Sequence, residues 1–437
     1  MSGKKSMFQV IVLSLFGLFA ILGLIFFATY SSKNQTKDIG RVIIWGTIKQ
    51  NVMNKFLRQI REDDPVYKKV LYAEYPEYNF EKKVTDALAA GEGPDIIILR
   101  HENLQKYKNK LFPISYDTFD RRSFKDRFID GAEIFMSPKG IYAIPFAVDP
   151  IVLYYNRDIF ADNTIVEPPT LWKQIPALTA QMTVRDKANN IDIATIALGG
   201  FENVTNAYAI LATLIQQAGT NITLYDYGSG RLSSGLVGNN ADKAAKALRF
   251  YTAFANPVSN TYTWNRSLPS SIELFTQDKL AMYIGYESDL PLILNKNPHL
   301  NFDIAEIPQV DRKDKDSRTR TYGRFWGFAI TKASKNKQGA YQFTLNMLQA
   351  KYAKMLTDML GISYAQRGLL SKKPEDPLKL IFRNSAIISY GFLDPDPEQT
   401  KTILSQMVND IISGQNFVNR AVNLAGSKLQ KILSREP

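Results

Sequence analysis

Two acidic side chains could act as a catalytic pair in this chain if the fold brings them together. Asp149 and Glu287 are the two residue types that glycosidases use as general acid and as nucleophile or base. The sequence does not fix their separation, and no serine-nucleophile, phosphate-loop or zinc-protease motif accompanies them. Catalysis is therefore the minor alternative, and we predict that the chain is not an enzyme.

The other candidate residues are mostly aromatic or basic, and they lie where predicted elements end or cross. Aromatic faces suit sugars and other solutes rich in C–H groups, whereas an arginine can clamp a carboxylate or phosphate. The predicted ligand-binding set is Trp45, Phe146, Asp149, Tyr286, Glu287, Arg324, Phe325 and Trp326. The open alternatives are core packing for the two tryptophans, a hinge-turn role for Asp149 and plain solvation for Arg324.

Composition excludes several other kinds of site. The chain of 437 residues has no cysteine and only two histidines, His101 and His299. This excludes disulfides and cysteine ligands, and it disfavours a histidine zinc site or catalytic triad. The net charge of +12 arises from basic residues interleaved with acidic ones, and no nucleic-acid-binding motif is present. We predict no metal, no cofactor and no nucleic-acid partner.

Residues 7–29 contain no charged side chain and would span about 35 Å as a helix, which is enough for a bilayer core. Lys4 and Lys5 precede this segment and favour a cytoplasmic N-terminus. A cleaved signal peptide is the alternative, but the apolar stretch is long and lacks a clear small-x-small cleavage site. We predict an uncleaved, single-pass anchor in the cell membrane, with the bulk of the chain extracytoplasmic.

Alternating strands and helices are predicted to position the first group of candidates. The predicted strands are residues 41–46, 69–75 and 95–99. Helical apolar spacing lies between them, which indicates a parallel sheet with its ligand beyond the carboxyl ends of the strands. Trp45, Arg100 and His101 occupy that kind of position. Asp95, at the start of its strand, is instead expected to serve folding by accepting nearby backbone N–H groups.

The segment 140–156 is predicted to join two sheets. Its two β-type runs, 141–144 and 151–155, are rich in isoleucine, valine and tyrosine. Pro145 and Pro150 lie between or beside them, and a proline cannot donate to a central ladder. We therefore expect the chain to leave one sheet, cross a short gap and enter another.

Two motifs in this order make the prediction more specific. Residues 89–99 read AAGEGPDIIIL, and residues 142–160 read YAIPFAVDPIVLYYNRDIF. Together they resemble the extracellular solute-binding proteins of bacterial ABC importers, the maltose-binding-like group. Residues 270–285 and 322–330 are similar to later segments of that family. The chain departs from the family at Tyr286, where many sugar-binding members have a tryptophan, which puts sugar stacking there in doubt.

The resemblance implies an α/β, periplasmic-binding-protein-like fold with two lobes, a ligand cleft between them and, here, an N-terminal transmembrane helix. The implied parts are 1–37 for the tip, anchor and tether, 38–146 with 323–366 for lobe one, and 147–322 with 367–437 for lobe two. Three crossings, at 140–156, 322–327 and 367–371, would form one hinge.

The resemblance also implies a function and partners. The chain would capture a small, carbohydrate-like solute by hinge closure and deliver it to the permease subunits of an ABC importer. The alternative is an envelope scaffold that holds a polymer with the same fold but serves no transport.

Overall fold

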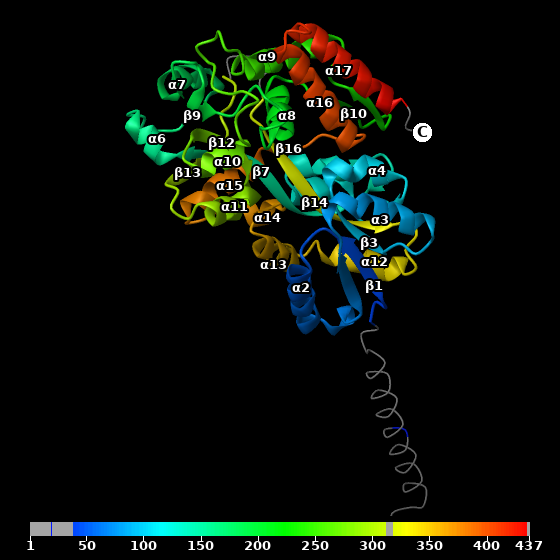
Figure 1. The fold of residues 1–437 in the computed structure, drawn as a ribbon. Coiled ribbons are helices and arrows are strands. Elements are labelled where there is room, and N and C mark those ends of the chain that lie inside the picture. The colour runs from blue at the N-terminus through cyan, green and yellow to red at the C-terminus, as the bar shows by residue number, and fades with distance from the viewer. Residues whose placement is uncertain (1–18, 20–37, 312–317, 435–437) are drawn as a thin grey trace, which may run out of the picture.

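The described part of the chain, residues 19, 38–311 and 318–434 of this computed structural model, forms two α/β lobes (Figure 1). The predicted anchor at 7–29 and the tether after it fall almost wholly outside these ranges. Within the described ranges, no helix combines the length and the apolar character needed to cross a bilayer.

The three strands predicted for the first lobe are present. They are β1 (Val42–Gly46), β2 (Val70–Glu74) and β3 (Ile96–Arg100). β1 pairs in parallel with both others, and β14 (Thr321–Thr331) adds to β3 antiparallel. The first four residues of β3 are all buried, as expected of a strand that is covered on both faces.

Amphipathic helices cover this sheet. α2 (Gln50–Asp63) buries Met53, Phe56, Leu57 and Ile60, which recur at helical spacing. The other helices of this region are α3 (Glu77–Ala89), α4 (Leu104–Lys108), α5 (Arg121–Arg127), α12 (Lys337–Asn346), α13 (Ala350–Leu360) and α14 (Arg367–Leu370). Short 3₁₀ turns lie at Pro65–Tyr67, His101–Asn103 and Asp130–Phe135, and short strands are β4 (Leu111–Phe112), β5 (Met136–Ser137), β6 (Gly140–Ile141) and β15 (Ser363–Tyr364).

The second lobe is built on β9 (Ile191–Ile196), β12 (Leu280–Tyr286) and β13 (Phe302–Ala305). Its helices are α6 (Arg157–Asp162), α7 (Ile175–Met182), α8 (Ala207–Gln217), α9 (Asn239–Ala253), α10 (Ser271–Thr276), α11 (Leu290–Lys296), α15 (Pro377–Ile387), α16 (Pro397–Ile412) and α17 (Val418–Leu433). Shorter pieces are β8 (Val184–Arg185), β10 (Thr223–Asp226), β11 (Arg231–Ser234), β16 (Ser389–Tyr390) and 3₁₀ turns at Trp172–Gln174 and Glu287–Asp289.

The prediction of a break in 140–156 is wrong, because β7 is one continuous strand from Ile144 to Asn156. Its partners change along its length: β14 pairs with the first half, and β12 and β13 pair with the second half. Pro145 lies opposite a register shift, and Pro150 lies where β14 gives way to β12. Both prolines therefore stand at irregular points of the ladder, where a missing donor costs little.

The third crossing also differs from the prediction. Residues 367–370 form the short helix α14 and not a hinge strand. The strands that accompany β7 and β14 in this region are β15, paired with β7, and β16, paired in parallel with β14. A two-residue strand carries too little β-type pattern to be read from sequence.

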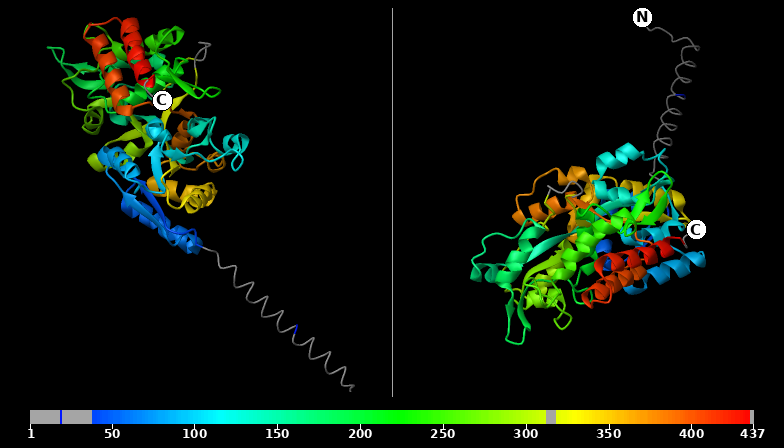
Figure 2. Two further views of the ribbon diagram at one scale, coloured as in Figure 1. Left: turned by 90° about the vertical axis from the view of Figure 1, so that its right-hand side faces the viewer. Right: turned by 90° about the horizontal axis from the view of Figure 1, so that it is seen from above.

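The described residues form two hydrophobic cores, and β7 and β14 each contribute to both of them. One core draws mainly on residues 39–148 and 325–370, and the other mainly on 151–322 and 404–433. Figure 2 shows the blue N-terminal elements at one end of the molecule in its left view, and the red C-terminal helices at the other end. The lobe boundaries given above stay a prediction, because the two cores meet along the shared strands.

Asp95 ties the start of β3 to the rest of its lobe. The buried carboxylate accepts hydrogen bonds from Ile43 N at 2.8 Å, Ser334 Oγ at 2.6 Å and Asn336 N at 3.2 Å. The carboxylate thus accepts backbone N–H groups, as expected, but all three donors lie far from Asp95 in the sequence and not in the adjoining turn.

Replacing Asp95 by asparagine should lower the free energy of unfolding by about 1–3 kcal/mol, because the amide would leave a buried donor facing a donor. Urea denaturation measures this, with the exposed Asp117→Asn as the control that should change nothing. Solute affinity of the folded fraction should stay the same. An unchanged stability with a large loss of affinity would contradict the structural role.

Candidate functional site

A cavity of about 320 Å³ opens between the two lobes. Arg100 and Glu102 reach it from the end of β3, and Tyr286 and Arg324 reach it from β12 and β14. The full lining is Glu77, Arg100, Glu102, Phe201, Glu202, Val204, Thr205, Asn206, Ala207, Tyr208, Ala209, Tyr286, Arg324, Pro397, Glu398 and Lys401. We call this cavity the cleft.

Arg324 is the central residue of the cleft. Its Nε lies 3.8 Å from Glu102 Oε1, and its guanidinium carbon lies 3.5 Å from the centroid of the Tyr286 ring. Arg324 thus contacts Glu102 of the first lobe and Tyr286 of the second. About 27% of its side chain is exposed, so the guanidinium also faces the cavity. A guanidinium held in this way can still donate to ligand hydroxyls or to an oxyanion.

Glu102 supplies a buried negative charge beside this arginine. Tyr322 Oη donates to Glu102 Oε1 at 2.9 Å, and Arg100 Nε lies 3.2 Å from Glu102 Oε2. Burial opposes ionisation, but Arg100 and Arg324 outweigh it and hold the pKa of Glu102 below its usual value. The carboxylate therefore stays ionised and can accept hydrogen bonds from sugar-type hydroxyls.

His101, next to Glu102, has a structural role. The Phe325 N–H donates to His101 Nδ1 at 3.1 Å, which fixes the neutral ring against β14. Burial lowers the pKa of His101 to about 4. A neutral, fully buried imidazole holds the end of β3 in place and thereby positions Glu102.

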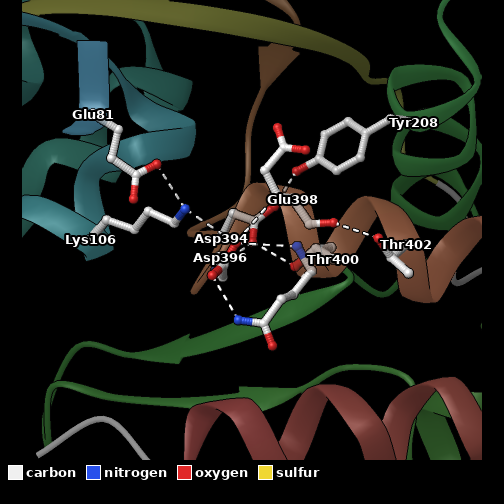
Figure 3. A network of polar contacts seen from close by, with 9 residues as sticks. Glu81, Lys106, Tyr208, Asp394, Asp396, Glu398, Thr400 and Thr402 are labelled. Carbon is white, nitrogen blue, oxygen red and sulfur yellow. Dashed lines mark hydrogen bonds and ion pairs between the residues drawn. The ribbon is translucent and has the colours of Figure 1, made fainter. Parts of the chain in front are cut away.

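The opposite wall comes from the start of α8. Asn206 Nδ2 donates to Tyr283 Oη at 3.0 Å and to Asp289 Oδ2 at 3.1 Å, which fixes the turn before the helix. Tyr208 Oη donates to Asp394 Oδ2 at 2.6 Å (Figure 3). Burial raises the pKa of Asp394 to about 7. These contacts hold amide and phenol groups at the edge of the cleft.

The start of α16 closes one side of the cleft. Asp396 caps this helix by accepting from Glu398 N and Gln399 N, both at 3.1 Å, and Pro397 suits the first helical position. Lys106 of α4 joins this cap to the first lobe, at 3.2 Å from Asp396 Oδ1 and 2.9 Å from Glu81 Oε2 (Figure 3). The Lys106–Asp396 contact is thus an ion pair between the lobes.

Of the eight residues in the predicted ligand-binding set, Arg324 and Tyr286 line the cleft, and Arg100, which was placed at a strand end, lines it too. Trp326 lies beside it, with its ring centroid 5.8 Å from the Arg100 guanidinium carbon, and Trp45 packs on Tyr75 at 4.7 Å. Both tryptophans are partly buried.

Phe146 and Phe325 are fully buried. Phe146 packs on Phe328 at 5.0 Å, and Phe325 lies 5.8 Å from the His101 ring. In this conformation neither ring has a face open to a solute.

The two carboxylates considered for catalysis are also buried, and neither lines the cleft, although Asp149 lies opposite Arg324 in the sheet. Asp149 accepts from Ser288 N at 3.0 Å and Ser288 Oγ at 2.7 Å, and Glu287 Oε2 accepts from Ser363 N at 2.9 Å. Burial raises the pKa of Asp149 to about 6 and that of Glu287 to about 8. Their hydrogen bonds join strand ends near β7.

No group of three or more potential metal ligands occurs within the described ranges.

The family model described as bacterial extracellular solute-binding protein matches residues 59–365, which is more than half of the chain. The chain belongs to this family.

Relatives of this solute-binding protein are distant in sequence. A protein of Brucella abortus (strain 2308), whose name describes it only as a binding protein, is 24% identical over 84% of this chain and 89% of its own length. A maltotriose-binding protein of Pyrococcus abyssi is 23% identical over 70% of this chain and 61% of its own. A solved cyclo/maltodextrin-binding protein, complexed with maltotetraose, superposes with a TM-score of 0.72 at 16% identity, covering 90% of this chain and 97% of that one. The two-lobe fold is thereby confirmed.

Sequence reasoning missed most of the cleft of this solute-binding protein. Glu102 follows β3 by two residues, so the rule of ligands at strand ends could have found it. The segment 201–209 and Lys401 carry no local signal of binding. They reach the cleft only through the packing of α8 and α16 in the second lobe.

Proposed function

We propose that the cleft binds a small, carbohydrate-like solute and that the protein delivers this solute to an ABC importer. The main support is the lining, in which Arg324, Glu102 and Tyr286 stand together between the lobes with the Asn206 and Tyr208 side chains opposite. Alternating donors and acceptors around an aromatic ring match the hydroxyls and C–H faces of sugars. The named ligands of the relatives, maltotriose and maltotetraose, belong to the same class.

The size of the cleft favours a small solute over a long polymer. A volume of about 320 Å³ lies at the lower end of small-molecule sites, which span roughly 300–1,000 Å³. Both lobes contribute to the lining, so a bound solute would stabilise their approach, and permease subunits would recognise that closed form.

A thermal-shift screen with mono- and oligosaccharides, polyols, amino acids and nucleosides tests this proposal. A sugar or polyol at about 100 times its dissociation constant should stabilise the protein by roughly 2.7 kcal/mol. Stabilisation by amino acids or nucleosides alone would show that the solute class is wrong.

We also propose that residues 7–29 keep the protein in the membrane, because this uncharged segment has the length of a bilayer core. N-terminal sequencing of protein extracted from membranes should find residues before Ser31 still attached, and alkaline washing should leave the protein in the membrane fraction. A mature N-terminus near Ser31 or Ser32, with soluble protein, would instead demonstrate a cleaved signal peptide.

A further inference from the structure

A second cavity, of about 850 Å³, lies between the lobes apart from the cleft. Its walls come from α4 and the β5–β6 hairpin on one side, and from the β10–β11 hairpin and the end of α17 on the other. Lys106 and Pro395 line this cavity, whereas Pro397 lines the cleft, so the Lys106–Asp396 ion pair stands between the two (Figure 3). We call this second cavity the hairpin cavity.

The hairpin cavity is basic. Lys106, Lys108, Lys139 and Arg231 line it, and no carboxylate does so among the residues that the structure describes. Lys106 is neutralised by Glu81 and Asp396. Within the described part of the chain, neither Lys139 nor Arg231 has a carboxylate within ion-pair distance, so positive charge remains at both hairpins.

Two tyrosines, Tyr142 and Tyr225, add aromatic surface to the hairpin cavity. Lys108 Nζ lies 6.0 Å from the Tyr142 ring centroid and 5.5 Å from that of Tyr225. The Tyr225 hydroxyl is buried and has no hydrogen-bond partner in the described structure. This hydroxyl is covered by protein atoms, so the two tyrosines offer ring surface to the cavity and not a free hydroxyl donor.

We propose that the hairpin cavity is a second binding site, for a carbohydrate or polyol that carries a carboxylate or phosphate group. Lys139 and Arg231 would pair with the anionic group, since guanidinium and ammonium groups bind oxyanions strongly. Tyr142 and Tyr225 would contribute aromatic surface beside the polyol. Because the walls come from both lobes, the ligand favours this arrangement of the lobes. The site is separate from the cleft and does not rest on the function proposed there.

Isothermal titration of the full-length protein in detergent tests this site, with glucose 6-phosphate, glucuronate, glucose and inorganic phosphate as probes. At least one of the two anionic sugars should bind, more weakly at higher ionic strength, and glucose should not compete with it. The double variant Lys139→Gln, Arg231→Gln should lower that affinity at least about tenfold. The exposed Lys187→Gln, which lines neither cavity, is the control for loss of a surface charge and should bind as the unmodified protein does.

Three results would overturn the proposal. The first is no binding of either anionic sugar at millimolar concentration. The second is inorganic phosphate binding as tightly as glucose 6-phosphate while glucuronate does not bind, because the site would then hold a bare anion. The third is loss of binding in Arg324→Gln but not in the double variant, which would place the anion in the cleft.

Discussion

Replacing Arg324 by glutamine should weaken solute binding about 10- to 100-fold, the largest loss expected for any single cleft residue. The guanidinium lies between Glu102 and Tyr286 and is partly open to the cavity. Losing a hydrogen bond from a charged donor costs roughly 1.5–3 kcal/mol. The free energy of unfolding should also fall, because buried Glu102 would lose one of its two cationic neighbours. Since Arg100 would remain beside Glu102, the loss should be limited to about 1–3 kcal/mol.

Titration calorimetry with the solute found in the thermal screen measures the affinity, and denaturation measures the stability. Arg122→Gln is the matched control, since Arg122 forms only an exposed pair with Asp126 on α5. If Arg324→Gln lowers stability and leaves affinity unchanged, the residue is only a brace between strands, and the solute binds elsewhere.

Replacing Glu287 by glutamine should flatten the dependence of stability on pH. Burial raises the pKa of Glu287 from 4.5 to about 8, with Asp149 adding to the rise. Between these values the folded protein holds a proton that the unfolded chain has released. Protonated Glu287 therefore stabilises the folded protein. This stabilisation is fully present below pH 4.5 and is lost as the pH rises through 8, by roughly 3–5 kcal/mol in all. The raised pKa of Asp149 has the same effect on stability, and its stabilising contribution is lost as the pH rises through its pKa of about 6.

Urea denaturation at several values between pH 5 and 8 tests this. The variant should be more stable than the unmodified protein at pH 8, because an amide oxygen can still accept from Ser363 N and carries no charge to bury. Glu62→Gln, at an exposed position of α2, should leave the pH profile unchanged. Parallel profiles for the unmodified protein and Glu287→Gln would contradict a buried, protonated Glu287.

The first lobe was predictable because its signals are local. β1 and β3 are short apolar runs that end in Gly46 and Arg100, and α2 repeats its apolar residues at helical spacing. The place of Asp95 after a glycine–proline turn predicts a structural role, and its three hydrogen bonds within the first lobe are consistent with that prediction. The overall two-lobe arrangement came from the family resemblance, and no local pattern could have replaced it.

The continuity of β7 was not predictable in the same way. A proline is costly in the middle of a regular ladder, and only the change of partner from β14 to β12 shows that Pro150 stands at the end of one. The lining of the cleft was not predictable either, since the packing of both lobes brings Glu102, Tyr208 and Lys401 together. Phe146 and Phe325 are of a residue type that can stack on a sugar, but at their positions on the strands both side chains are buried in the core.

Small-angle X-ray scattering tests the central claim most directly, namely that a carbohydrate-like solute closes the two lobes. The unmodified protein would be measured alone and with the sugar or polyol that stabilises it most. We expect a smaller radius of gyration at a solute concentration that just saturates the unmodified protein, and a return toward the larger value in Arg324→Gln at that same concentration. A solute that binds tightly and leaves the radius of gyration unchanged would contradict hinge closure, and would favour a rigid protein that holds a polymer.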